Sequence, residues 1–148
     1  MIKHFLDLDN FSISELKKIL KFANKIKKKS IKYSSILNNK SLGLLFEKQS
    51  TRTRLSFSIG MQKLGGNVIE LDTNQVGFGT RESKEDILKA MSQYLDILMI
   101  RNHNHQQLIK LASLNTLPII NGLSDYSHPC QILSDIFTIE EFLGKIEN

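Results

Sequence analysis

The chain alternates short apolar runs with longer stretches in which apolar residues recur every three or four positions. The apolar runs predict strands at 42–46, 67–71, 96–100 and 117–121. The periodic stretches predict helices at about 51–64, 83–95, 106–114 and 129–143, and an amphipathic helix begins after Ser12. Strands and helices that alternate with short connections form βαβ units. The pattern therefore predicts an α/β fold with three layers, in which a four-stranded parallel sheet is flanked by helices.

Local signals mark the ends of several of these helices. Ser12 followed by Glu15 is the signature of a capping box, and Gly65-Gly66 suits the end of the helix over 51–64. The first helix also carries a cluster of lysines between Lys17 and Lys29. Such a cluster could bind nucleic acid, but no aromatic residues interleave with the lysines, and apolar residues at helical spacing mark an inner face. We interpret the lysines as the solvated face of a surface helix.

The turn from the first strand into the next helix is suited to an anion. It reads Ser50-Thr51-Arg52-Thr53-Arg54. The first backbone N–H groups of a helix lack partners within it and lie at the positive end of its dipole. The arginines and hydroxyls of this run would add charge-assisted bonds to a phosphate. A plain alternative is that Ser50 or Thr51 caps the helix and the arginines lie at the surface. One cap, however, does not need the whole run.

Polar residues also follow the other predicted strands. Gln75 lies in the loop after the second strand, Arg101 ends the third, and His128 and Gln131 follow the fourth. In open parallel sheets, ligands bind beyond the carboxyl ends of the strands. We therefore interpret the anion site as part of an active site. Taken alone, His128 before Pro129 could simply help to cap the last helix.

Composition limits the classes of protein that remain. The chain has 148 residues, the length of one domain, with 41% hydrophobic and 24% charged residues and a formal net charge of +5. No apolar run approaches the ~20 residues needed to span a membrane, and the first residues do not resemble a secretory signal. The single cysteine, Cys130, excludes an internal disulfide. These features favour a cytoplasmic protein.

Two other kinds of chemistry are less well supported. His103 and His105 could ligate a metal, but two histidines at this spacing beside a helix start are more typical of surface residues. Cys130 could act as a nucleophile, but no second histidine is positioned in the sequence to activate it. We expect no metal and no organic cofactor.

Two motifs resemble the signatures of one family, the aspartate and ornithine carbamoyltransferases. The run from Phe46 to Arg54 resembles the first signature, and His128-Pro129-Cys130-Gln131 resembles the second. Cysteine in the third position of the second signature is the ornithine form, whereas the aspartate enzymes typically have threonine there. The segment from Asn121 to Asp125 also resembles ornithine enzymes. The chain departs from common family patterns around Phe78-Gly79-Thr80-Arg81.

The resemblance implies a fold, an activity and an assembly. Members have two domains, and residues 1–148 resemble the carbamoyl-phosphate-binding domain alone, without the ornithine-binding domain, so we expect little turnover from this chain. The implied reaction is ornithine carbamoyltransfer, which converts carbamoyl phosphate and L-ornithine to L-citrulline and phosphate in arginine biosynthesis. The implied assembly is a homotrimer, with no nucleic-acid or membrane partner. Aspartate carbamoyltransferase or another amine acceptor is the alternative within the family. Outside the enzymes, a basic anion- or nucleic-acid-binding module and a domain for assembly alone remain open.

The resemblance also implies roles for individual residues. Ser50, Thr51, Arg52 and Thr53 would bind the phosphate, and Arg101 would bridge the phosphate and the carbamoyl oxygen. His128 would donate to the same oxygen, and Gln131 would hold the carbamoyl nitrogen. Arg101, His128 and Thr53 are thus the expected catalytic residues. Gln75 would reach the phosphate of a neighbouring subunit. Carbamoyl phosphate would also contact Pro129 and Cys130.

Overall fold

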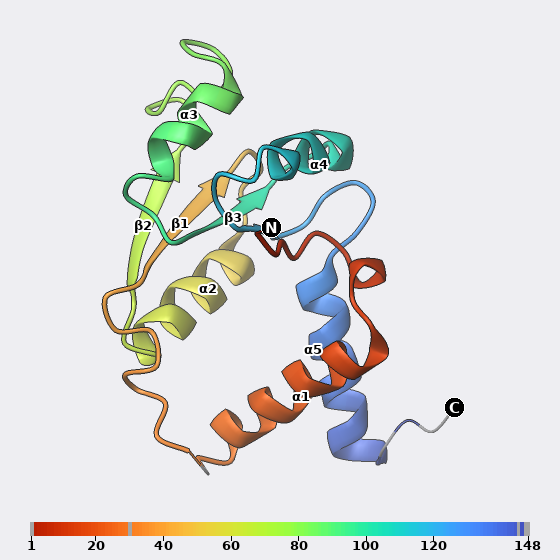
Figure 1. The fold of residues 1–148 in the computed structure, drawn as a ribbon. Helices are drawn as coiled ribbons and strands as arrows, with labels where there is room; N and C mark the ends of the chain where they lie inside the picture. Colours follow the sequence, from red (N-terminus) through yellow and green to blue (C-terminus); the bar gives the residue numbers. More distant parts are fainter. Residues whose placement is uncertain (1, 30, 145, 147–148) are drawn as a thin grey trace.

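A four-stranded parallel sheet runs through the middle of the protein (Figure 1). In the computed structural model, which describes residues 2–29, 31–144 and 146, the strand order is β2-β1-β3-β4. The strands are β1 (Ser41–Phe46), β2 (Asn67–Asp72), β3 (Ile97–Arg101) and β4 (Ile119–Asn121). Every neighbouring pair is parallel, which confirms the predicted fold class.

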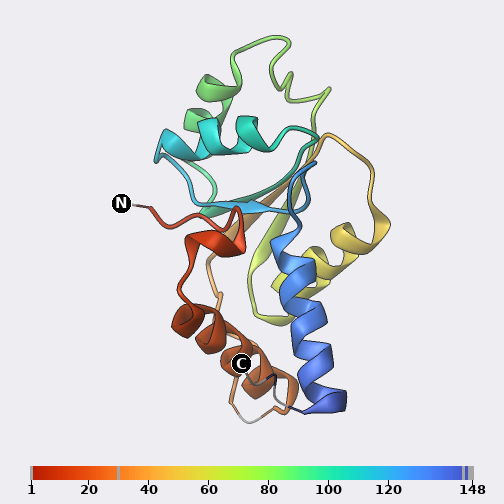
Figure 2. The ribbon, with the colours of Figure 1, turned by 90° about the vertical axis from the view of Figure 1, so that its right-hand side faces the viewer.

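Helices form a layer on each side of this sheet. They are α1 (Ile13–Lys27), α2 (Thr51–Lys63), α3 (Lys84–Met91), α4 (His105–Ser113) and α5 (Pro129–Leu143), with a short 3-10 turn, η1, at Leu8–Asn10. Figure 2 shows α3 and α4 on one face of the sheet and α1, α2 and α5 on the other. Among the described residues, no helix is long and apolar enough to cross a membrane.

The central strands are apolar throughout because both of their faces are buried. Along β3, Leu98 and Ile100 belong to the core under α3 and α4, whereas Ile97 and Met99 belong to the core under α2. This period of two along a continuous apolar run explains how one strand supplies both sides of the sheet. The sheet thereby holds the carboxyl ends of β1 and β3 in a fixed register, with Phe46 opposite Arg101.

The first helix begins as predicted but is less covered than predicted. Both halves of the capping box are present, because the Ser12 N–H donates to Glu15 Oε2 at 2.9 Å and the Glu15 N–H donates to Ser12 Oγ at 3.3 Å. No residue of α1 is buried, and Ile13 is 65% exposed. The prediction that its apolar residues form an inner face is therefore only partly met within this chain.

Two elements differ from the predicted boundaries. Helix α3 ends at Met91 rather than near Leu95, and a tight turn follows that carries Leu95 into the core. Strand β4 begins at Ile119 rather than Leu117, since Pro118 has no N–H to donate to the ladder. Phe5 pairs with the outer edge of β4. Its N–H donates to Ile119 O, and its carbonyl accepts from the Asn121 N–H, both at 2.8 Å.

The order in which strands are added to the sheet reverses at β1. From β1, one connection leads to β2 at the edge of the sheet, and the later connection leads to β3 on the other side of β1. Such a reversal opens a crevice at the carboxyl ends of the two central strands, which is where open α/β sheets bind ligands. The turn after β1 and Arg101 at the end of β3 lie on this edge.

Candidate active site

Ser50 starts helix α2 and shapes the turn that leads into it. Its backbone is extended, with φ −159° and ψ 120°, and its hydroxyl accepts a hydrogen bond from the Thr53 N–H at 3.3 Å. This is the capping role that the plain alternative proposed for the run. The helix start is thereby fixed with its remaining N–H groups and its positive dipole end directed at the strand ends.

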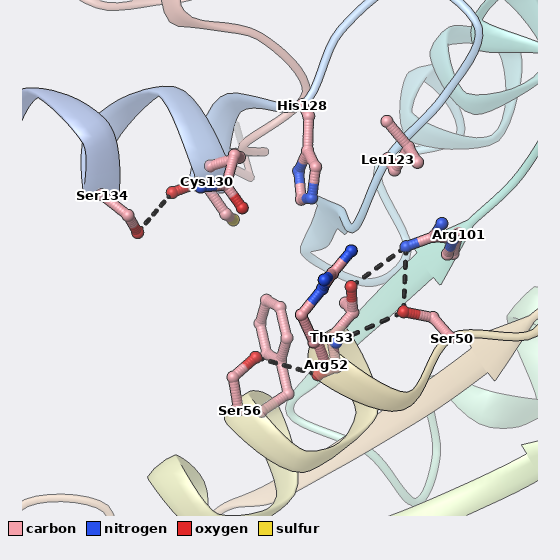
Figure 3. Close-up of a pocket in the computed structure, with 11 residues that line it drawn as sticks. Ser50, Arg52, Thr53, Ser56, Arg101, Leu123, His128, Cys130 and Ser134 are labelled. Atoms are coloured by element: carbon pink, nitrogen blue, oxygen red, sulfur yellow. Dashed lines mark hydrogen bonds between the residues drawn. The ribbon is translucent and has the colours of Figure 1, made fainter.

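Arg101 lies across this turn and is the centre of the site (Figure 3). Its Nη1 donates to the hydroxyl oxygens of Ser50 and Thr53, at 3.0 Å each. The Arg101 carbonyl accepts from the Glu47 N–H at 3.0 Å, so the backbone at this point also joins the two strand ends. Arg101 Nε is buried without a hydrogen-bond partner among the described residues. A buried, unpaired guanidinium nitrogen is costly unless a ligand accepts from it.

His128 faces the same space from the start of α5. Its ring makes no capping hydrogen bond to the helix, and Figure 3 shows it pointing toward Arg52. Within the described part of the chain, its Nδ1 is buried without a partner. Burial lowers the pKa of His128, as does the positive charge of Arg101, against an opposing effect of Asp135. The imidazole is therefore mainly neutral near pH 7, so one ring nitrogen carries a proton that it can donate.

These residues surround a cavity of about 360 Å³ between α2 and α5. This volume is within the range of small-molecule sites. The cavity is lined by Ser50, Arg52, Thr53, Ser56, Phe57, Arg101, Leu123, His128, Cys130, Gln131 and Ser134. The strands and helices thus bring together two motifs that are far apart in the sequence.

Three of the predicted site residues do not line the cavity. Thr51 has an exposed side chain in the first turn of α2, although its backbone belongs to the turn that was predicted to bind an anion. Pro129 is buried at the first position of α5, where its missing N–H costs nothing. Gln75 is exposed in the loop after β2, where its N–H donates to Asp72 Oδ1 at 3.3 Å.

The cavity also contains residues that the sequence did not single out. Ser56 follows Thr53 by one helical turn, and Ser134 follows Cys130 in the same way, so helical spacing from the motifs would have identified both. Phe57 supplies part of the apolar wall. Leu123 lies in the segment from Asn121 to Asp125 that resembles ornithine enzymes, but it was not among the predicted site residues. Its φ of 138° is rare for a residue with a side chain and arises from the fold of its loop.

A buried asparagine holds the loop that leads to His128. Asn121 is fully buried; its Oδ1 accepts from the Leu123 N–H at 3.0 Å, and its Nδ2 donates to the carbonyls of Leu6 at 3.0 Å and Ser127 at 3.1 Å. Its side chain therefore satisfies backbone groups at both ends of the loop. This explains how Leu123 is kept in a strained conformation beside the cavity.

The metal site and the cysteine nucleophile considered from the sequence gain no support from the structure. His105 is buried, with Nδ1 2.9 Å from Ser124 Oγ, so the prediction of a surface histidine is wrong for this residue. His103 is exposed. The described residues contain no cluster of histidine, cysteine and carboxylate side chains that could hold a metal. Burial raises the pKa of Cys130 to about 11, which keeps the thiol protonated and poorly nucleophilic.

The comparison with known families decides the assignment. The model of the aspartate/ornithine carbamoyltransferase carbamoyl-phosphate-binding domain matches residues 3–141. The chain belongs to this family. Both signature motifs of the family therefore lie around one cavity, and the fold that joins them is the carbamoyltransferase fold.

Individual carbamoyltransferases show how far this similarity extends. The chain is 42% identical to an ornithine carbamoyltransferase of Methanocaldococcus jannaschii over 97% of its own length and 47% of the relative. It superposes with a TM-score of 0.88 on ornithine carbamoyltransferase from Pyrococcus furiosus, at 38% identity and over 96% of this chain and 46% of that one. An aspartate transcarbamoylase from Trypanosoma cruzi gives a TM-score of 0.89 at 25% identity, over 99% and 46% of the two chains. The chain thus spans about half the length of the relatives that it matches.

Proposed function

We propose that this chain is the carbamoyl-phosphate half of an ornithine carbamoyltransferase. The complete enzyme would transfer the carbamoyl group of carbamoyl phosphate to the side-chain amine of L-ornithine, giving L-citrulline and phosphate. The observation that carries the proposal is the position of Arg101. Its guanidinium is fixed by two hydroxyls of the β1–α2 turn, and its Nε has no partner among the described residues of the protein.

The β1–α2 turn would hold the phosphate. A dianion placed there would meet the positive end of the α2 dipole, the Arg52 guanidinium and the free donors of Arg101. The hydroxyls of Ser50 and Thr53 already accept from Arg101, so each retains its own proton. The Ser50 proton would go to a phosphate oxygen, and the Thr53 proton would be free for the carbamoyl oxygen. Arg52 would also neutralise charge on the phosphate as it leaves.

The opposite wall of the cavity would hold the carbamoyl group. As the acceptor amine attacks the carbamoyl carbon, negative charge builds on the carbamoyl oxygen. Arg101, Thr53 and the neutral ring of His128 would donate to this oxygen, and Gln131 would accept from the carbamoyl nitrogen. Donors of this kind stabilise the transition state more than the ground state, and each typically contributes ~10²-fold or more in rate. Direct attack by the amine needs neither a metal nor an enzyme nucleophile.

The choice of ornithine as the acceptor rests on the second motif and on the relatives. Cys130 occupies the position in which ornithine enzymes carry cysteine and aspartate enzymes carry threonine. In the structural superpositions, identity to the Pyrococcus furiosus ornithine enzyme is 38%, against 25% to the Trypanosoma cruzi aspartate enzyme. The acceptor itself would be bound mainly by the second domain of the family. Aspartate carbamoyltransfer is therefore the second candidate.

Gln75 would act in a neighbouring copy of the chain. It is exposed and does not line the cavity of its own chain, as expected for a residue lent to another subunit of a homotrimer. In an active enzyme, a Gln75→Ala variant and an Arg101→Met variant should each be nearly inactive. Mixing the two should restore part of the activity. A site that takes Arg101 from a Gln75→Ala chain and Gln75 from a neighbouring Arg101→Met chain has both residues intact. Mixed trimers with no recovery would contradict the shared site.

Two chimeras would test the proposed function. One joins this chain to the second half of the Pyrococcus furiosus ornithine enzyme, and the other joins it to the second half of the Trypanosoma cruzi aspartate enzyme. We expect citrulline from the first and little carbamoyl-aspartate from the second. An Arg101→Met copy of the first chimera is the control for background activity. A folded ornithine chimera without activity beside an active aspartate chimera would overturn the choice of acceptor.

A further inference from the structure

Lys84 forms the most enclosed ion pair among those that the described residues make. Its Nζ lies 2.5 Å from Glu47 Oε1, and the two side chains are only 20% and 19% exposed. Six other ion pairs between described residues each have a partner that is at least 45% exposed. Exposed pairs contribute little to stability, whereas loss of one member of an enclosed pair leaves a poorly solvated charge behind.

The surroundings of Lys84 satisfy its ammonium group and hold its side chain in place. Besides Glu47, Nζ donates to Gln107 Oε1 at 2.8 Å and lies 4.7 Å from the ring centre of the buried Phe78. The side chain also passes directly over Gly79, where a Cβ atom would come within 2.7 Å of Lys84 Cε. The lysine is thus fixed by four neighbours rather than one.

Through these contacts Lys84 connects the two strand ends that form the cavity. Glu47 directly follows β1 and precedes the anion-binding turn by three positions. Gln107 Oε1 also accepts from Asn102 Nδ2 at 2.6 Å, and Asn102 directly follows Arg101. Asn102 is buried, and its N–H donates to the carbonyl of Leu123 at 3.1 Å, on a third side of the cavity. One ammonium group therefore joins the segments that carry Ser50, Arg101 and Leu123.

Lys84 does this from outside the cavity. It begins α3, and Gln107 lies in the first turn of α4, on the sheet face opposite α2 and α5. Neither Lys84 nor Glu47 lines the cavity. Lys84 therefore cannot act by touching a ligand in the cavity. Its hydrogen bonds to Glu47 and Gln107 act instead on the segments that follow β1 and β3.

We propose that Lys84 is a positioning residue for carbamoyl phosphate. It holds the β1–α2 turn and the end of β3 at the separation that lets Arg101 bond to Ser50 and Thr53, and so keeps the anion site formed before the ligand arrives. This inference rests on the proposed function for its ligand. The structural part of it, control of the turn by Lys84, can be measured without any ligand.

A matched lysine supplies the control. Lys110 of α4 pairs with Glu85 of α3 at 2.8 Å, on the same side of the sheet, but does not join the strand ends. We would compare Lys84→Met, Lys84→Arg, Glu47→Gln and Lys110→Met with the unaltered chain. If Lys84→Met does not fold, Glu47→Gln tests the same contact with a smaller change. Thermal unfolding of each variant establishes that the fold is retained.

The ligand-free measurement is amide hydrogen exchange of the segment 47–54. We expect exchange there to be about tenfold faster in Lys84→Met than in the unaltered chain, with no change in Lys110→Met. Lys84→Arg should recover part of the protection, and Glu47→Gln combined with Lys84→Met should add little to Lys84→Met alone. Exchange that rises equally along the whole chain, or equally in Lys110→Met, would overturn the inference.

Titration with carbamoyl phosphate then separates the inference from the proposed function. If the unaltered chain binds, Lys84→Met should bind about tenfold more weakly and Lys110→Met equally well. Equal binding by Lys84→Met would overturn the positioning role while leaving the proposed function in place. If the unaltered chain does not bind but segment 47–54 still exchanges faster in Lys84→Met, the proposed ligand is wrong and control of the turn by Lys84 stands.

Discussion

The guanidinium of Arg101 donates a 3.0 Å hydrogen bond to the hydroxyl of Thr53, a residue 48 positions earlier in the chain. This bond joins the end of β3 to the first turn of α2 across the point where the strand order reverses. It fixes the long arginine side chain before any ligand binds, so that less conformational entropy is lost on binding. The Arg101 side chain is therefore preorganised for a ligand.

Replacing Arg101 should therefore remove ligand binding without unfolding the protein. We expect Arg101→Met to weaken carbamoyl-phosphate binding by ~100-fold or more, since a positive charge and its donors are lost from an enclosed site. The measurement is calorimetric titration, with circular dichroism to establish the fold. Arg54→Met is the matched control, because Arg54 lies beside Thr53 in the first turn of α2 but forms an exposed pair with Glu70 at 2.9 Å. Equal losses in the two variants would contradict the assignment of Arg101.

Stability should decline when the pH falls below about 6.5, the ordinary pKa of histidine. Burial lowers the pKa of His128 and of His4, so the folded state binds protons less readily than the unfolded state. The contribution of the two neutral histidines to the free energy of unfolding is complete above about pH 6.5. It is lost as the pH falls toward their lower pKa values in the folded state. Urea unfolding at a series of pH values measures this slope. It should be shallower in His128→Gln, and an unchanged slope in that variant would show that His128 does not titrate in this way.

The thiol of Cys130 should react slowly. Because burial raises its pKa to about 11, only a very small fraction is thiolate at pH 8. Alkylation by iodoacetamide at that pH should be roughly 100-fold slower than that of a free cysteine, even before steric hindrance is considered. A rate equal to that of free cysteine would reopen the hypothesis of a cysteine nucleophile.

Two glycines of neighbouring elements should respond oppositely to alanine. A Cβ at Gly43 in β1 would come within 2.6 Å of Leu95 Cδ1 and 2.8 Å of Leu98 Cδ1, so Gly43→Ala should lower the free energy of unfolding by about 1–3 kcal/mol. At Gly60 in α2 a Cβ meets nothing within 4 Å, so Gly60→Ala should raise it by about 0.5–1 kcal/mol. Chemical denaturation measures both. A loss of stability in Gly60→Ala would contradict the open surface at that position.

The parts of the fold that could be predicted from the sequence are those fixed by local patterns. The strand–turn–helix around Ser50 is determined by an apolar run, a capping serine and a helical stretch, all within a few residues. The convergence of Arg101 and His128 on this turn followed from the rule that parallel strands present their carboxyl ends at one edge. The structure places both residues at one cavity.

The parts that could not be predicted depend on distant contacts. Pairing of Phe5 with Ile120 joins residues that are far apart in the chain, and nothing local to Phe5 indicates it. Burial of His105 depends on Ser124, which belongs to the loop after β4 and is 19 positions away in the sequence. The position of Lys84 likewise required the structure, because its two partners come from the end of β1 and from α4.

The central claim is that the cavity beside Arg101 recognises the carbamoyl group as well as the phosphate. Calorimetric titration of this chain with carbamoyl phosphate, and with inorganic phosphate as the control ligand, tests it most directly. We predict tighter binding of carbamoyl phosphate, with the difference lost in His128→Ala and Gln131→Ala while phosphate binding remains. Equal affinity for the two ligands in the unaltered chain would contradict the claim and leave only a phosphate-binding turn.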